Sequence, residues 1–192
     1  MGLIDEKAKL SGLIVEKERF LERLKVKSTE YYDYRIQLGD FNYGRRLPGT
    51  EKCRLRRIKE FPNGSCYFGE WLEGFDVIQG KGMLIDQQGF IFEGWFIDSE
   101  LVTGRYLWSD MYQYVGKFQK FKAHGQGSAY YKNGSMYIGQ WKNGSFHGEG
   151  TYYYLNGESW QGEWEMGKAK GAGVFINIEK RSISKEFRGF QK

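Results

Sequence analysis

Cysteine and long apolar runs are both scarce in this chain, and each scarcity excludes a class of protein. Only Cys53 and Cys66 occur in 192 residues, which is too few for the disulfide framework of a small secreted domain. No apolar run approaches the roughly 20 residues that cross a bilayer, and no secretory signal sequence is visible. We therefore expect a cytoplasmic protein with reduced thiols.

Aliphatic residues are also scarce in the last two-thirds of the chain, where few leucine, isoleucine and valine residues occur. Aromatic residues make up 18% of the whole sequence, and glycines number 27. Burial must therefore come from rings laid over a sheet, because glycine in a strand leaves bare backbone that a neighbouring ring can cover. This composition indicates an antiparallel sheet rather than a thick globule.

An aromatic–glycine–aromatic triplet recurs at nearly constant spacing. Its central glycines are separated by 25, 22, 23 and 23 residues. Such a period predicts one supersecondary unit that is copied in tandem. The triplets are Tyr67-Gly69-Trp71, Phe92-Gly94-Phe96, Tyr114-Gly116-Phe118, Tyr137-Gly139-Trp141 and Trp160-Gly162-Trp164.

Two further signals predict that each unit is a β-hairpin. A Gly-x-Gly motif such as Gly148-Glu149-Gly150 follows the triplet in most units, and an Asn-Gly or Gln-Gly pair precedes most of the triplets. Side chains alternate across a strand, so the triplet puts two rings and a vacancy on one face. We expect Asn133-Gly134 to form a two-residue type I′ turn, which needs a positive φ at both positions.

This combination of signals resembles the MORN repeat. The unit that begins at Tyr137 carries almost the whole pattern, with Tyr137-Ile138-Gly139-Gln140-Trp141, Asn143-Gly144 and His147-Gly148-Glu149-Gly150 in order. The resemblance covers roughly residues 61 to 192 and implies a mainly β fold, an elongated single-layer antiparallel meander of tandem hairpins. Ser99 and Phe121 replace the glycine that the pattern has after the second aromatic, and we expect local bulges or a partner contact there.

The first sixty residues predict a different structure. Their leucine and isoleucine residues recur at three-, four- and seven-residue steps, which is typical of an amphipathic helix from about Leu3 to Val26. We divide the chain into this helix (residues 1–30), an aromatic and basic linker that can hold a cap strand (31–60), the repeat array (61–175) and a C-terminal capping segment (176–192). The apolar stripe could bind a partner's helix or groove, and it consists of Leu10, Leu13, Ile14, Leu21 and Leu24.

The net charge of +5 lies entirely before the repeats. One interpretation is a docking patch for an acidic protein, a tubulin tail or anionic lipid headgroups. The alternative is a solvated edge strand whose charges discourage aggregation. Nucleic acid is a poorer match, because the array lacks an extended basic track. The candidate patch is centred on Arg45, Arg46, Arg54, Arg56 and Arg57.

The sequence offers little support for catalysis, for a cofactor or for a metal. His124 and His147 lie one repeat apart, so each holds the same structural place in its unit, and neither has converging ligands at a suitable spacing. Gly80-Lys81-Gly82 is not followed by the Ser or Thr of a phosphate-binding loop. We expect no catalytic, cofactor-binding or metal-binding residues.

Three functions from different classes remain open. The resemblance implies a structural scaffold that bridges larger proteins, notably in the cytoskeleton and in the axoneme of a cilium or flagellum, where tubulin-associated proteins are expected partners. It also implies a membrane-contact module, for which only the basic stretch at residues 45–59 is available. An enzyme is the third alternative, although no segment of the chain fits a catalytic domain.

Overall fold

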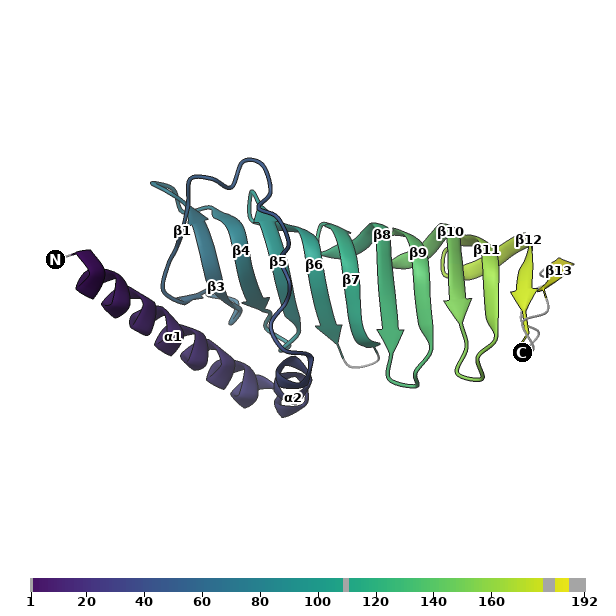
Figure 1. The fold of residues 1–192 in the computed structure, drawn as a ribbon, viewed down its shortest axis with the longest axis horizontal. Coiled ribbons are helices and arrows are strands. Elements are labelled where there is room, and N and C mark those ends of the chain that lie inside the picture. The colour runs from purple at the N-terminus through teal and green to yellow at the C-terminus, as the bar shows by residue number, and fades with distance from the viewer. Residues whose placement is uncertain (1, 109–110, 178–181, 187–192) are drawn as a thin grey trace. The chain divides into compact units, whose positions relative to one another are not determined.

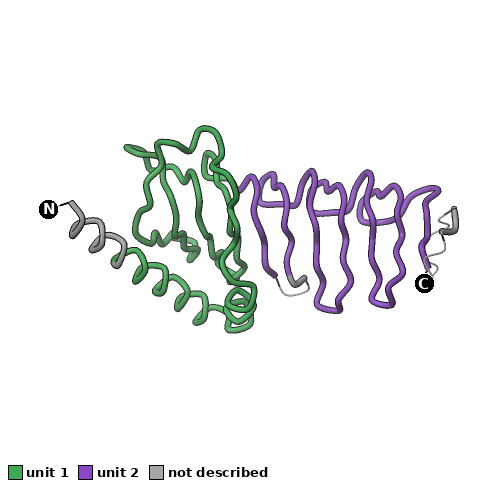
Figure 2. Tube along the Cα trace, viewed as in Figure 1, with its two compact units in different colours: residues 1–100 green, residues 101–192 purple. Residues whose placement is uncertain are grey.

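The structure is a computed structural model that describes residues 2–108, 111–177 and 182–186, with side chains described for residues 12–108 and 113–177. The chain forms two compact units, unit 1 at residues 1–100 and unit 2 at residues 101–192 (Figure 2). Helices α1 and α2 and strands β1 to β5 belong to unit 1, and β6 begins at the boundary (Figure 1).

Unit 1 begins with two helices, α1 (Gly2–Lys27) and α2 (Thr29–Leu38), which we call the arm. Helix α1 confirms the predicted N-terminal helix. Residues 31–38, which we expected to be the aromatic start of a linker, are helical instead. Ser28 caps this helix, α2, by accepting a hydrogen bond from the Tyr31 N–H. Gly39, with a φ of 69°, ends α2.

The sheet of unit 1 contains β3 (Cys66–Leu72), β4 (Ile78–Ile85) and β5 (Ile91–Ile97) in antiparallel order. The short strands β1 (Cys53–Leu55) and β2 (Lys59–Glu60) both pair with β3. Short, charged edge strands of this kind discourage pairing with another chain.

Strands β3 to β5 are buried on both faces. Tyr67 and Trp71 lie on one face, which we call the ring face. Phe68 lies on the opposite face, where the ring of Phe20 from α1 covers it at a centroid distance of 6.0 Å. Tyr31 of α2 contacts Phe90, just before β5, edge to face. The arm therefore completes the core of unit 1.

Unit 2 is an antiparallel meander in which each strand pairs with the next one in the sequence. Burial alternates along its strands, as in β9, where Tyr137, Gly139 and Trp141 are buried and Ile138 and Gln140 are exposed. The prediction of a mainly β antiparallel meander that follows an N-terminal helix is confirmed. The strands are β6 (Glu100–Trp108), β7 (Met111–Gln119), β8 (Lys122–Tyr131), β9 (Met136–Lys142), β10 (Ser145–Tyr153), β11 (Ser159–Glu165), β12 (Lys168–Ile176) and β13 (Ser182–Glu186).

Glycines face one another across neighbouring strands, and the rings of the triplets lie over them. Gly139 of β9 pairs with Gly150 of β10, and a Cβ added to Gly150 would collide with the Tyr137 ring. The Tyr137 hydroxyl donates to the Gln140 carbonyl at 3.1 Å, and burial raises the pKa of Tyr137 above its ordinary value, so that the hydroxyl keeps its proton. Missing side chains therefore allow each ring to pack against backbone.

The Gly-x-Gly motif has a second function that its sequence did not indicate. Its first glycine has a positive φ, 57° at Gly148 and 64° at Gly171. The strand register shifts at the same places. For Gly148 the shift lies between Phe146 and Gly150, and for Gly171 it lies opposite Gly162 and Glu163 on the neighbouring strand. The first glycine of the motif therefore forms a β-bulge. The second glycine is the one that packs against a ring.

The hairpin turns differ from the predicted type I′ assignment at Asn133-Gly134. Only Gly134 of that pair has a positive φ, at 84°, and Tyr131 and Ser135 are hydrogen-bonded around a three-residue loop. Asn133 instead accepts hydrogen bonds from the backbone and hydroxyl of Ser135. The longer loop needs left-handed backbone at its last residue alone.

Two-residue turns with positive φ at both positions occur at the other end of the hairpins. Asn143-Gly144 has φ values of 53° and 86°. Phe121, at a φ of 56°, and Ser99, at 66°, adopt the same backbone as Gly144. The expected bulges are therefore absent at these two described positions, and non-glycine residues hold strained turns in their place.

The turn Met166-Gly167 allows a test of this strain. Met166 has a φ of 49° and is 83% exposed, so replacing it with asparagine removes no buried contact. We expect Met166→Asn to raise the free energy of unfolding by about 0.5–1 kcal/mol, because asparagine tolerates left-handed backbone better. Thermal melting measures the effect. The reverse change in the equivalent turn, Asn143→Met, should lower the melting temperature, and equal melting of both variants would contradict the assignment.

Candidate functional site

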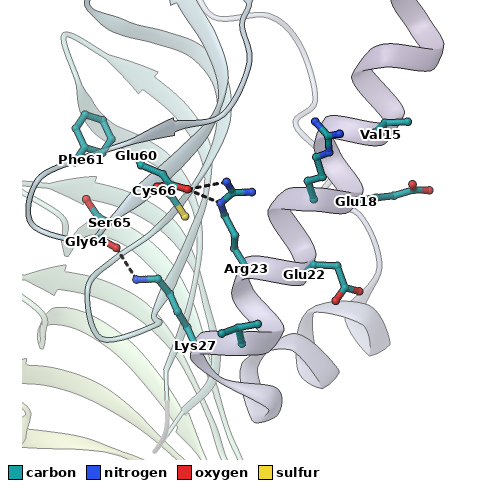
Figure 3. A pocket seen from close by; sticks show the side chains of 12 residues that line it. Val15, Glu18, Glu22, Arg23, Lys27, Glu60, Phe61, Gly64, Ser65 and Cys66 are labelled. Atoms are coloured by element: carbon teal, nitrogen blue, oxygen red, sulfur yellow. Dashed lines mark hydrogen bonds and ion pairs between the residues drawn. The ribbon is translucent and has the colours of Figure 1, made fainter.

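A groove of about 600 Å³ lies in unit 1 between α1 and the hairpin that joins β2 to β3 (Figure 3). One flank of α1 forms one wall, and residues 60–66 form the other. Val15 is 44% exposed and Val26 is 87% exposed. A partly apolar hollow of this size is sufficient to receive side chains of a partner or a small molecule.

Polar groups of α1 bind the opposite wall of the groove. Arg23 of α1 makes an ion pair with Glu60 at 2.7 Å, and Lys27 donates to the Gly64 carbonyl at 2.5 Å, as Figure 3 shows. Lys27 also donates to the Asp86 carbonyl of the neighbouring hairpin at 3.3 Å. These groups already bind the arm to the sheet. A ligand in the groove would therefore contact mainly its apolar walls.

Cys66 is a buried residue at this groove. Burial raises the pKa of its thiol, so the thiol is protonated at neutral pH and is a poor nucleophile. Among the residues that the structure describes, no three His, Cys, Asp or Glu side chains lie close enough together to hold a metal ion.

The predicted apolar stripe of α1 is divided between core and surface. Leu24 is 1% exposed and belongs to the core of unit 1, while Leu13 and Leu21 are half-buried. Ile14 is 55% exposed. The side chain of Leu10 lies outside the described side chains. Phe20, which is fully buried, was not part of the predicted stripe, because that stripe was defined by leucine and isoleucine residues alone.

Acidic residues of β3 and of the loop after it pair with much of the predicted basic patch. Arg46 contacts Glu70 at 2.8 Å, and Arg54 contacts Glu73 at 3.6 Å. Arg56 and Lys59 both lie within 4 Å of Asp76. Arg45 and Arg57 are exposed. Counting charges within residues 45–59 overestimated the patch, since its counter-ions come from a later part of the chain.

Arg56 also has a structural role at the start of the array. Its guanidinium lies 5.3 Å from the centre of the Trp71 ring and donates to the carbonyl of Phe75 at 2.7 Å. In unit 2 the corresponding rings of Trp141 and Trp164 each donate to a glycine carbonyl, at 3.0 Å. The Trp71 indole N–H has no such partner among the described residues, so Arg56 covers the first ring where a preceding repeat would lie.

Unit 2 leaves exposed the face that the arm covers in unit 1. We call this the open face, and it is the side of β7 to β12 opposite the rings. Tyr130, Ile138 and Tyr153 on this face are each 37–41% exposed. Tyr130 and Tyr153 both pair with Met136 in the strand register, so they flank one position of β9.

The family model of the MORN repeat matches the chain at residues 114–136, 137–159 and 160–176. A comparison with curated proteins gave no match. No helix within the described residues is long and apolar enough to cross a bilayer. MORN repeats generally act as protein or membrane interaction modules and are not an enzyme family. The tandem matches coincide with the ring-over-glycine hairpins of unit 2, and the chain therefore contains tandem MORN repeats over residues 114–176.

Proposed function

We propose that this protein is a non-catalytic adaptor that bridges larger proteins in a cytoskeletal assembly, and that the assembly is the axoneme of a cilium or flagellum. The observation that carries the proposal is the presence of two separate uncovered surfaces. Unit 1 has the groove beside α1, and unit 2 has the open face with Ile138. A chain with two docking surfaces can hold two partners, and repeat sheets provide the extended surfaces that such contacts use.

The ion pairs around the basic stretch favour a protein partner over a membrane. Arg46, Arg54 and Arg56 have acidic neighbours within the chain, so fewer positive charges remain for anionic headgroups. Surface ion pairs contribute little stability, yet they reduce the long-range attraction to an anionic surface. The same pairing weakens the expectation of a tubulin tail at this stretch.

Fractionation of ciliated cells that express the tagged full-length chain tests the proposal. We expect the protein to stay with the detergent-insoluble cytoskeleton after membranes are extracted. The double change Val15→Asp and Val26→Asp should release at least half of it, because charges in the groove oppose apolar docking. Leu155→Asp is the matched control, since Leu155 is 74% exposed in unit 2, and it should leave retention unchanged.

Sedimentation with phosphatidylserine vesicles tests the membrane alternative. The adaptor proposal expects no binding at physiological salt. Binding that falls as salt rises, together with loss of the protein from the detergent-insoluble fraction, would overturn the adaptor proposal in favour of a membrane-contact module.

A further inference from the structure

We infer that the open face of unit 2 binds an amphipathic α-helix of a partner protein, with a large apolar side chain over Ile138 and a basic side chain at Glu163. This inference rests on the proposed adaptor function and names the kind of partner that this surface takes. Its basis is an internal comparison, because unit 1 contains the same repeat face already occupied by the chain's own helices.

The apolar contact comes from equivalent positions in two repeats. Phe68 stands between Tyr67 and Gly69, and Ile138 stands between Tyr137 and Gly139. Phe68 is 7% exposed because Phe20 of α1 lies on it, whereas Ile138 is 41% exposed. The repeat thus presents the same position to a helix in both units, and among the described residues a helix of this chain lies on that position in unit 1 alone.

The charged contact also comes from equivalent positions in two repeats. Glu70 stands between Gly69 and Trp71, and Arg46 binds it through both terminal guanidinium nitrogens, at 2.8 and 3.3 Å. Glu163 has the same position between Gly162 and Trp164, and it is exposed. A second acidic residue in unit 1, Glu93, is bound by Arg35 of α2 at 3.1 Å. Acidic groups on this face of unit 1 are therefore bound by cations of the same chain, which come from α2 at Glu93 and from the loop after α2 at Glu70.

The surroundings of Glu163 favour a basic ligand. Glu149 lies directly opposite Glu163 in the strand register, and like charges in opposite positions destabilise a sheet. Lys170 lies opposite Glu163 on the other side and attracts it, but its ammonium makes its close ion pair with Glu165, at 3.0 Å. A cation from a partner would relieve the repulsion between the two glutamates, which gives the open face charge complementarity to a basic helix.

Strand geometry sets the spacing of the two contacts. Ile138 and Glu163 are two strands apart and offset by one pair of residues along the strands, so their Cα atoms are about 12 Å apart. A helix rises 1.5 Å per residue, so its two contacting residues should be about seven or eight positions apart. In α1, Phe20 and Lys27 have this spacing.

A labelled peptide of residues 12–38, which is most of the chain's own arm, is therefore a suitable probe for the full-length protein. In fluorescence anisotropy we expect it to bind, and a scrambled peptide not to bind. Ile138→Asp should weaken binding about tenfold, and Glu163→Lys should weaken it severalfold, because each removes a central contact. Leu155→Asp should have no effect. A Lys27→Glu peptide should recover affinity for the Glu163→Lys protein alone.

Two outcomes would overturn the inference. The first is that the peptide does not bind the full-length chain. The second is that binding is the same in the Ile138→Asp and Glu163→Lys proteins, which would mean that the peptide exchanges with the arm on unit 1 instead. Neither outcome changes the retention of the full-length chain in the cytoskeletal fraction, so failure of the helix site and failure of the adaptor proposal are distinguishable.

Discussion

Replacing Gly139 with valine should destabilise unit 2 by about 3 kcal/mol or more, because overpacking here meets backbone as well as a ring. A Cβ at Gly139 would lie 2.5 Å from the Gly150 Cα and 2.6 Å from the Tyr137 hydroxyl oxygen. The Gly150 backbone cannot move aside without breaking the β9–β10 ladder, in which the two glycines are directly opposite. Urea denaturation, with hydrogen exchange of residues 136–165 as a local measure, would detect the loss.

The matched control is Gly12→Val in α1, where a Cβ would have no neighbouring atom within 4 Å. Valine and glycine both lower helix stability, so this control should change the free energy of unfolding by less than about 1 kcal/mol. Equal stability of the two variants would contradict the model in which rings pack over bare glycine backbone.

Removing Arg35 should produce the second large effect. Arg35 and Glu93 are almost fully buried, with 3% and 2% of their side chains exposed. The Arg35 guanidinium also donates to the Gly39 carbonyl at 2.8 Å and pairs with Asp40 at 2.8 Å. Arg35→Met leaves Glu93 buried without this cation, and breaking such a pair costs about 3–5 kcal/mol. The arm should then detach, and hydrogen exchange at β3 to β5 should rise while β9 to β11 stay protected.

The double variant Arg35→Met with Glu93→Met separates charge from packing. Replacing both members of a buried ion pair with apolar residues of similar volume is often neutral or stabilising, so the double variant should recover most of the lost protection. If the single change left β3 to β5 as protected as in the unchanged protein, the arm would have no part in the core of unit 1.

Asp40 indicates how the arm responds to acid. Hydrogen bonds from Arg35 and Lys17 lower the pKa of Asp40 from 3.8 to about 2. Its contribution to stability is therefore present above about pH 4 and is lost as the pH falls toward 2. Asp40 is largely exposed, so solvent screening keeps this contribution small.

The hairpins could be predicted from the sequence because their signals are local and repeated. A period of about 23 residues identified the unit, and the alternation of Tyr137, Gly139 and Trp141 placed the rings on one face. The turn types could not be predicted in the same way. Whether Asn133 or Asn143 takes a positive φ depends on the number of residues between paired positions, which is set by the strand register.

The sequence by itself determined the repeat, the antiparallel pairing and the ring face, because these follow from residues a few positions apart. Only the tertiary structure decided that the helices of the arm cover the opposite face of unit 1, since Phe20–Phe68 and Arg35–Glu93 join distant parts of the chain. It also decided which arginines have counter-ions, and that Ile138 is 41% exposed where Phe68 is 7% exposed. The physical reason is that burial and charge pairing depend on all neighbours in space, and a sequence pattern reports only neighbours along the chain.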